Sequence, residues 1–131
     1  MVRYATDLAG IEARHLHGFF EGWSSPPDPD RHLAALRAAY RVVVALDGDR
    51  VVGFVNAIGD GVLSAFIPLL EVLPEYRGRG IGSELTRRML AELEDIRAVD
   101  LCCDAELEGY YRRFGMEPVV GMAIRRTPRS S

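Results

Sequence analysis

The sequence contains no lysine, and all 16 of its basic residues are arginine. A Walker A phosphate loop requires lysine directly before serine or threonine, so that class of nucleotide-binding protein is excluded. Acidic residues number 19, and the resulting formal net charge of −3 argues against nucleic acid as the main partner. The exclusive use of arginine, together with abundant alanine, is typical of a GC-rich bacterial genome.

Cysteine is scarce as well. The two cysteines, Cys102 and Cys103, are adjacent, a spacing whose geometry disfavours an ordinary disulfide between them. Because the chain has no C-x-x-C motif, we expect reduced thiols in a cytoplasmic protein. His15 and His17 lie two residues apart in an expected helix and face different sides of it. They cannot share a metal ion, and no metal site is predicted.

Long hydrophobic runs are also missing. The longest apolar stretch, residues 62–73, is interrupted by polar residues and proline and is too short to span a bilayer. The first four residues lack the apolar core of a signal peptide, so no membrane partner is expected. With 131 residues, 48% hydrophobic and 27% charged, the chain is predicted to form one domain over residues 1–131.

A glycine-rich stretch, Tyr-Arg-Gly-Arg-Gly-Ile-Gly-Ser, occupies residues 76–83. Because glycine lacks a Cβ, the backbone there can turn sharply and approach a ligand closely. Several N–H groups can then point into one concavity, and a following helix adds its unpaired N–H groups and the positive end of its dipole. A tight strand-to-helix turn is the structural alternative, but the two arginines within the stretch favour a phosphate site.

A dinucleotide-binding Rossmann fingerprint, G-x-G-x-x-G, does not fit this stretch. Ser83 occupies the third glycine position counted from Gly78, and Leu85 occupies it counted from Gly80. Asp100 does follow at the distance of a ribose-binding acid, but too little sequence remains for a doubly wound sheet.

The spacing of apolar residues and turn signals predicts an alternation of helices and strands. Asp28 and Pro29 are typical of a helix N-cap and first residue, and Asp104 and Gly115 are expected to begin and end a later helix. In order, the predicted elements are a strand at 2–5, helices over 7–22 and from 29 onward, strands at 41–46, 50–58 and 62–73, a helix over 81–96, a strand at 98–103, a helix over 105–114, a strand at 119–124 and a terminal tail at 127–131.

Pro68 interrupts the pattern of the strand at 62–73. Proline cannot donate to a strand ladder and is found at edges or bulges, so we predict a distortion there that leaves backbone groups unpaired for a ligand. Two short strands joined at a kink are the alternative.

Three segments together resemble the GNAT superfamily of N-acetyltransferases. Arg77-x-x-Gly80-x-Gly82 matches the family's pyrophosphate loop, Val72 to Tyr76 is similar to the lead-in to that loop, and Tyr110 to Met116 is similar to its F-Y-x-x-x-G-F segment. The order of elements is also similar. The resemblance implies an α/β (α+β) fold with a mixed sheet, mostly antiparallel, with a parallel pair formed by the strands at 62–73 and 98–103.

The resemblance further implies acetyl-CoA as cofactor, with its pyrophosphate held by the glycine-rich loop. It also implies that backbone amides of the strand at 62–73 bind the acetyl oxygen, at Leu70, and the pantetheine arm, at Val72. The implied cofactor-binding residues are Leu70, Val72, Arg77, Gly78, Arg79, Gly80, Ile81 and Gly82.

Spacing alone favours a core stripe that includes Tyr110 and Tyr111. The resemblance instead assigns the protonation of the departing thiolate to Tyr111, while Tyr110 is expected to be a packing residue. For the base that deprotonates the amine, Glu71 is the candidate, because it is an acid in an otherwise apolar strand. Ordered water is the alternative base. Asp104 stands where asparagine is common in the family, which leaves a cofactor contact there in doubt.

The function expected from this resemblance is acetyl-CoA-dependent N-acetyltransfer to a primary amine by direct attack. The alternatives are a CoA-binding or regulatory module with weak or no catalysis, and a protein N-terminal or lysine acetyltransferase. The acceptor is expected to be a small-molecule amine or a peptide amine. A homodimer is also expected, because a short C-terminal region leaves an unpaired sheet edge.

Overall fold

The computed structural model describes residues 1–126, and the predicted tail at 127–131 lies outside this range. Its framework is a five-stranded sheet in the order β1-β2-β3-β4-β5. All neighbouring strands are antiparallel except β4 and β5, which are parallel, so the mixed sheet predicted from the sequence is confirmed. The strands are β1 (Arg3–Ala5), β2 (Arg41–Asp47), β3 (Arg50–Gly59), β4 (Ser64–Val72) and β5 (Ala98–Leu101).

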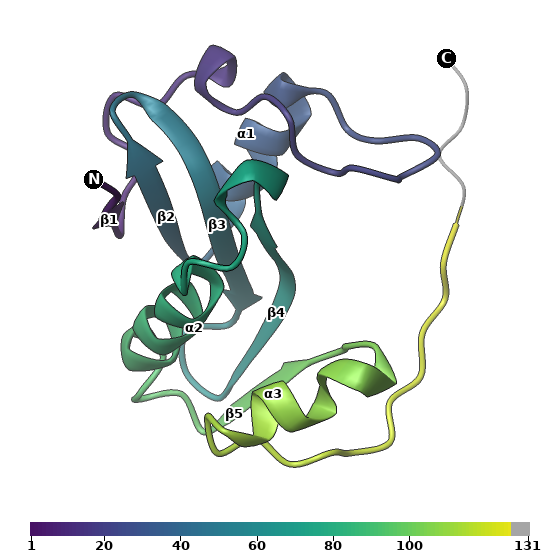
Figure 1. The fold of residues 1–131 in the computed structure, drawn as a ribbon. Coiled ribbons are helices and arrows are strands. Elements are labelled where there is room, and N and C mark those ends of the chain that lie inside the picture. The colour runs from purple at the N-terminus through teal and green to yellow at the C-terminus, as the bar shows by residue number, and fades with distance from the viewer. Residues whose placement is uncertain (127–131) are drawn as a thin grey trace.

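Helices cover both faces of the sheet (Figure 1). The three α-helices are α1 (Pro29–Ala38), α2 (Ile81–Glu92) and α3 (Glu108–Arg112), and short 3-10 turns occur at Ala13–His15, Pro74–Tyr76 and Ala105–Leu107. The Asp28 side chain caps α1 by accepting a hydrogen bond from the Arg31 N–H, as its sequence predicts. No helix within residues 1–126 is long and apolar enough to cross a membrane.

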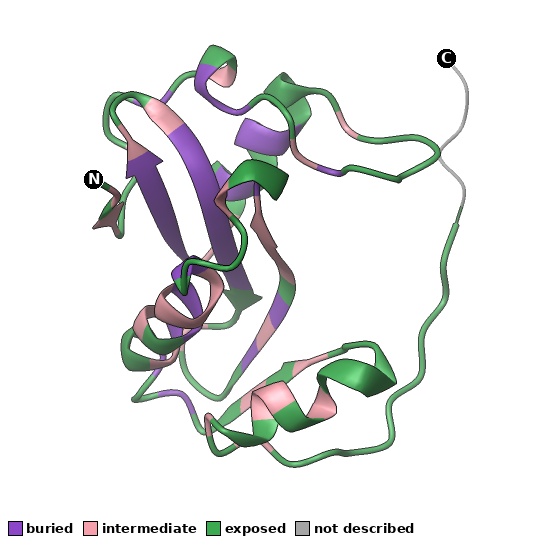
Figure 2. Ribbon diagram, in the orientation of Figure 1, coloured by how far each residue is buried: buried purple, intermediate pink, exposed green. Residues whose placement is uncertain are grey.

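The side chains of β2 explain why the sheet is buried on both faces. Val43 and Ala45 pack in one cluster with Leu85 and Met89 of α2, while Val44, between them in sequence, packs in a second cluster with residues of α1. Successive side chains of a strand point to opposite faces, and here both faces are covered by apolar side chains. Figure 2 shows this buried centre at β2 and β3, with exposure increasing toward β5 and α3.

The helix predicted over residues 7–22 is absent, and only the 3-10 turn at Ala13–His15 forms there. Gly10 and Gly18 have φ of +76° and +94°, and Phe20 has φ of +65°, all incompatible with a right-handed helix. Three of the apolar residues that suggested the helix, Ile11, Leu16 and Phe20, are nevertheless buried. The spacing of these residues therefore indicated that the segment is buried, but it did not indicate a helix.

Pro68 lies at a break in the β3–β4 register, as predicted. Phe66 is opposite Ile58 and Leu69 is opposite Asn56, so two residues of β4 face a single residue of β3. This is a β-bulge. The parallel pairing with β5 ends at this bulge, with the pair Ile67 and Leu101. Beyond the bulge, β4 pairs with β3 alone within the described residues.

The strand predicted at 119–124 does not form, and this segment has no regular secondary structure. The predicted strand at 98–103 is also shorter and ends at Leu101. Asp104 precedes a 3-10 turn but makes no side-chain capping hydrogen bond, so its predicted capping role is wrong. Gly115, with φ of +86°, does end the last helical region, as expected.

His32 of α1 is enclosed by aromatic rings. The centroids of Phe20 and Phe54 lie 4.8 Å and 4.5 Å from that of the imidazole, and neither imidazole nitrogen has a hydrogen-bond partner among residues 1–126. Burial of the ring disfavours its charged form and lowers the His32 pKa from 6.5 to about 4.

We expect this histidine to make the fold sensitive to acid. Because the pKa is lower in the folded chain, the unfolded chain binds more protons below pH 6.5, and stability is lost as the pH falls from 6.5 toward 4. His32→Leu should flatten this part of the profile of melting temperature against pH. His17→Leu, at an exposed position, is the control and should leave the slope unchanged. Equal slopes in the wild type and His32→Leu would contradict this assignment.

Candidate active site

The glycine-rich loop joins the end of β4 to the first turn of α2. Gly78 and Gly80 have φ of +78° and +81°, and Gly80 is the N-cap of α2. A Cβ at either position would meet no atom within 4 Å, so backbone conformation, and not lack of space, requires glycine there. A turn of this kind at a helix start allows the N–H groups of the loop and of the first helical turn to point into one concavity.

A hollow of about 260 Å³ lies against this loop. It is lined by Val72, Tyr76, Arg77, Gly78, Gly80, Ile81, Gly82, Ser83 and Tyr110. Six of the eight predicted cofactor-binding residues are therefore brought together, whereas Leu70 and Arg79 lie outside the lining. The hollow combines backbone donors with the positive end of α2, an arrangement suited to binding a phosphate group.

Both arginines of the loop make local contacts. Arg77 donates from Nε to the Val72 carbonyl at 3.1 Å, and its Nη1 lies 3.6 Å from a carboxylate oxygen of Glu21. Arg79 donates to the Glu75 carbonyl and lies over the Tyr76 ring. The two guanidinium groups therefore brace the loop by bonding to backbone carbonyls of the residues just before it.

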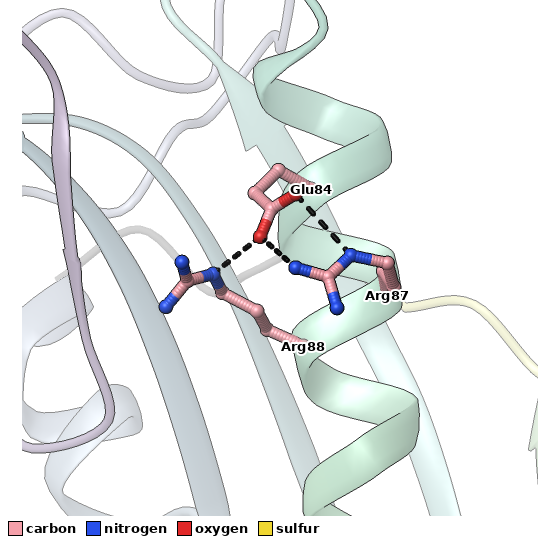
Figure 3. Close-up of polar contacts among 3 residues, drawn as sticks. All are labelled: Glu84, Arg87 and Arg88. Carbon is pink, nitrogen blue, oxygen red and sulfur yellow. Dashed lines mark hydrogen bonds and ion pairs between the residues drawn. The ribbon is translucent and has the colours of Figure 1, made fainter.

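Glu84 places a negative charge in the first turn of α2, at the end of the helix that follows the glycine-rich loop. Figure 3 shows its carboxylate bound by Arg87 and Arg88 on the same helix. These two partners lower the pKa of Glu84 and balance its charge. Glu84 and Arg88 thus form an i,i+4 ion pair, whereas Glu92, four residues after Arg88, lies near Arg41 instead.

The free edge of β4 faces the space that β5 leaves beyond the bulge. The Leu73 N–H donates to the Val52 carbonyl of β3. Because the N–H groups of a strand alternate between its two sides, those of Leu70 and Val72 point away from β3. The Val72 carbonyl points the same way, since it accepts the bond from Arg77. Both predicted backbone donors therefore lie on the unpaired edge.

Tyr110 and Tyr111 are neighbours in α3 with different surroundings. The Tyr110 hydroxyl lies 3.3 Å from Thr86 Oγ1 of α2, and a Cβ on Gly82 would lie 3.8 Å from it. Sequence reasoning had assigned Tyr110 to packing, but it lines the loop hollow. Tyr111 lines a second, larger hollow beside β5, and burial raises its pKa.

Glu71 is half-buried on β4 and is hydrogen-bonded to a segment that is distant in sequence. Its Oε1 accepts the Phe20 N–H at 3.0 Å, while its other oxygen has no protein hydrogen-bond partner within residues 1–126. Burial raises the Glu71 pKa above its usual value, opposed by the Phe20 N–H and by Arg77. Glu71 also holds Phe20 in its left-handed conformation, which costs backbone strain.

Comparison with known proteins gives a consistent result. The sequence matches the acetyltransferase (GNAT) family over residues 8–116. It is 32% identical over 81 residues to N-alpha-acetyltransferase 30 of Schizosaccharomyces pombe, covering 55% of this chain and 54% of that protein. It is 33% identical over 84 residues to the chloroplastic serotonin N-acetyltransferase 2 of Oryza sativa, covering 60% of this chain and 42% of that protein. The chain thus spans about half the length of the curated relatives it matches.

Solved structures resemble nearly the whole chain. A crystal structure of a proposed acetyltransferase from Deinococcus radiodurans R1 superposes with a TM-score of 0.92 at 44% identity, covering 95% of this chain and 88% of the other. A GNAT family protein from Streptococcus pneumoniae superposes with a TM-score of 0.78 at 29% identity, covering 98% and 100%. The glycine-rich loop, the β4 edge and both tyrosines lie within the family match.

Proposed function

This chain belongs to the GNAT family of acetyltransferases, and we propose from that premise that it transfers the acetyl group of acetyl-CoA to a primary amine by direct attack. One observation carries the proposal. β4 parts from β5 at the bulge beside Pro68, and its freed edge leads directly into the glycine-rich loop at the start of α2. Acetyl-CoA would supply an acetyl group activated as a thioester. The chain's own residues would bind this cofactor and move the protons.

Binding of the cofactor is the first task. The N–H groups around Gly78, Gly80 and Gly82 and the positive end of α2 would hold the pyrophosphate. The outward N–H of Val72 would pair with the pantetheine arm, as a strand pairs with a neighbour. The N–H of Leu70 would donate to the acetyl oxygen as negative charge develops on it, an interaction that contributes a few kcal/mol in a water-poor cleft.

Proton movement is the second task. Glu71 would accept the proton lost by the attacking amine, because burial raises its pKa and one of its oxygens has no hydrogen-bond partner in the described part of the chain. Tyr111 would give a proton to the departing CoA thiolate, since a phenol with the ordinary pKa of 10.0 is protonated at neutral pH and burial raises the Tyr111 pKa further. With both transfers, the products are an acetamide and free CoA thiol.

The acceptor would enter beside Glu71, where the irregular segment around Phe20 covers β4. A cationic amine would be attracted by the carboxylate, and Trp23, whose ring packs on Phe20 and is half exposed, would contact its apolar part. The names of two relatives specify a protein N-terminal amine and serotonin. Small-molecule amines and peptide amines are therefore the two acceptor classes to test.

The direct test is release of CoA thiol from acetyl-CoA by the purified protein in the presence of amines. The library should contain aryl-alkyl amines, polyamines and peptides with free N-termini or lysine side chains. We expect release that depends on one acceptor class, with a mass increase of one acetyl group on that acceptor. Tight CoA binding without transfer to any amine would instead identify a CoA-binding module.

Binding of CoA should depend strongly on the charge at Gly80. Gly80→Asp places a carboxylate at the N-cap of α2, beside the proposed phosphate position, and should weaken CoA binding at least about tenfold in calorimetry. Gly80→Asn has nearly the same size without the charge and should lose less affinity. Gly10→Asp is a matched control for strain, because Gly10 has a similar φ and equally open surroundings away from the hollow. Unchanged affinity in folded Gly80→Asp would contradict the phosphate assignment.

A further inference from the structure

The turn of the β2–β3 hairpin and the start of the glycine-rich loop lie at the same end of the sheet. Val72, the last residue of β4, is opposite Gly53 near the start of β3, and Asp47 pairs with Arg50 where the hairpin turns. Figure 1 shows the turn that follows β4 at the end of the sheet where β2 and β3 are joined. Side chains can therefore connect the hairpin turn to the residues that lead into the loop.

Tyr76 makes this connection through its hydroxyl. The hydroxyl donates a hydrogen bond to Oδ2 of Asp47, 29 residues earlier in the chain. A second contact runs parallel to it, because Nη2 of Arg50 lies 3.7 Å from a carboxylate oxygen of Glu75. The last two residues of the 3-10 turn Pro74–Tyr76 are thus both attached to the hairpin by their side chains.

Tyr76 is also attached to the core, whereas the residues after it are not. Its ring packs against the buried cluster on the α2 face of the sheet, and residues 77–80 are all exposed. The Tyr76 N–H donates to the carbonyl of Leu73, a buried residue, at 2.9 Å. The Arg79 guanidinium lies 4.8 Å from the centroid of the Tyr76 ring. The position of Tyr76 therefore determines where the exposed loop begins.

The loop itself has little to hold its conformation. The N–H groups of Gly78, Arg79 and Gly80 donate to no backbone carbonyl within residues 1–126. Glycine has many accessible conformations, so an arrangement that directs several N–H groups at one anion costs conformational entropy unless neighbouring residues restrict the loop. On one side this restriction comes from α2, which begins at Ile81, and on the other side it comes from Tyr76.

Asp47 acts at a distance from the anion site. The hollow beside the loop is lined by Tyr76 but not by Asp47. A carboxylate has the same sign of charge as a phosphate, so the charge of Asp47 taken alone would weaken the binding of CoA. A favourable effect of Asp47 on CoA binding must therefore act through Tyr76.

We propose that Asp47 is a positioning residue for the cofactor loop. By accepting the Tyr76 hydroxyl, it holds the glycine-rich loop in the arrangement that presents the loop N–H groups to the pyrophosphate. This inference rests on the proposed binding of CoA at the loop, and it adds the β2–β3 hairpin to the parts of the chain that determine cofactor affinity. The affinity for acetyl-CoA should therefore depend on Asp47, whereas the chemical step should not.

Calorimetry with CoA tests the proposal through the sign of the effect. Asp47→Ala removes the acceptor and should weaken binding about threefold or more, whereas loss of a negative charge alone would strengthen binding. Asp47→Asn keeps an oxygen that can accept the Tyr76 hydroxyl and should restore most of the affinity. Asp49→Ala removes the same charge from the same turn and is the matched control, because Asp49 is exposed and takes part in no ion pair within residues 1–126. It should bind CoA at least as tightly as the wild type. Unchanged or tighter binding by Asp47→Ala would overturn the proposal.

Tyr76→Phe tests the same bond from its other end. It removes the hydroxyl but keeps the ring against the core and beneath Arg79. The affinity for CoA should fall as in Asp47→Ala, and the double variant should bind no more weakly than the weaker single variant, because both substitutions remove one bond. Each variant should raise KM for acetyl-CoA and leave kcat nearly unchanged. Additive losses of affinity, or a fall in kcat alone, would overturn the proposal.

Backbone dynamics of the free protein separate this proposal from the proposed function. NMR order parameters of the amides at residues 78–80 should fall in Asp47→Ala and Tyr76→Phe, but not in Asp49→Ala. Unchanged order parameters in both variants would overturn the positioning role. Lower order parameters in a chain whose wild type binds no CoA would instead contradict the proposed function and support the control of the loop by Asp47.

Discussion

Tyr111→Phe is expected to lower kcat by about 10²- to 10⁴-fold, with little change in melting temperature or CoA affinity. The substitution keeps the half-buried ring, and so its packing beside β5, but removes the hydroxyl that would protonate the leaving thiolate. A thiol pKa near 8.5 already makes the thiolate a fair leaving group, so the loss should not exceed this range.

Tyr110→Phe is the matched control for this experiment. It removes a hydroxyl from the adjacent position, one that lies 3.3 Å from Thr86 and lines the loop hollow. We expect it to affect CoA binding more than turnover. Full turnover in Tyr111→Phe with a good acceptor would contradict the assignment, and a large loss of kcat in Tyr110→Phe alone would transfer the role to Tyr110. Loss of folding in Tyr111→Phe would instead indicate a core residue.

Glu71→Gln is expected to lower kcat/KM by a similar factor, about 10²- to 10⁴-fold near neutral pH. Glutamine keeps an oxygen that can accept the Phe20 N–H, so the covering segment should stay in place. It cannot take a proton from the amine, which makes this variant specific for the base. Glu71→Ala removes both functions and should also lower the melting temperature, because the Phe20 N–H loses its partner.

The pH dependence supplies an independent check on Glu71. Because burial raises the pKa of this carboxyl, the wild-type rate should fall on acidification at a pH above the usual glutamate value of 4.5. This fall in rate on acidification should be absent in Glu71→Gln. The pH dependence of stability that this carboxyl contributes has the opposite sign to the pH dependence of activity. A raised carboxyl pKa favours the folded state at low pH, and that contribution is lost as the pH rises through the folded-state value. Full activity of Glu71→Gln would assign the proton transfer to water.

Much of the fold followed from local sequence. The hairpin between β2 and β3, the helix capped by Asp28 and the helix α2 were predicted within a few residues of their observed bounds. The bulge was also predicted, because Pro68 lacks an N–H wherever it stands in a ladder. These features depend on the backbone preferences of a few neighbouring residues, which the sequence displays directly.

The predictions that were wrong concern segments whose structure depends on tertiary contacts. Apolar spacing over residues 7–22 predicted a helix, but glycines at positive φ and tertiary burial produced an irregular segment. Apolar residues at 119–124 predicted a strand, but strands require a partner, and none of the described strands pairs with this segment. In both places the sequence showed which side chains are apolar, but it did not specify the secondary structure of the segment.

The family, the glycine-rich loop and the mixed sheet could be predicted from the sequence alone, because each depends on residues close together along the chain. The fold was needed to show that Glu71 is half-buried and accepts a hydrogen bond from Phe20, 51 residues away, and that Tyr110 and Tyr111 line different hollows. It also decided that β5 keeps an open edge beside an exposed apolar segment. The physical reason is that burial, pKa shifts and edge pairing arise from contacts between segments distant in sequence, which no local pattern encodes.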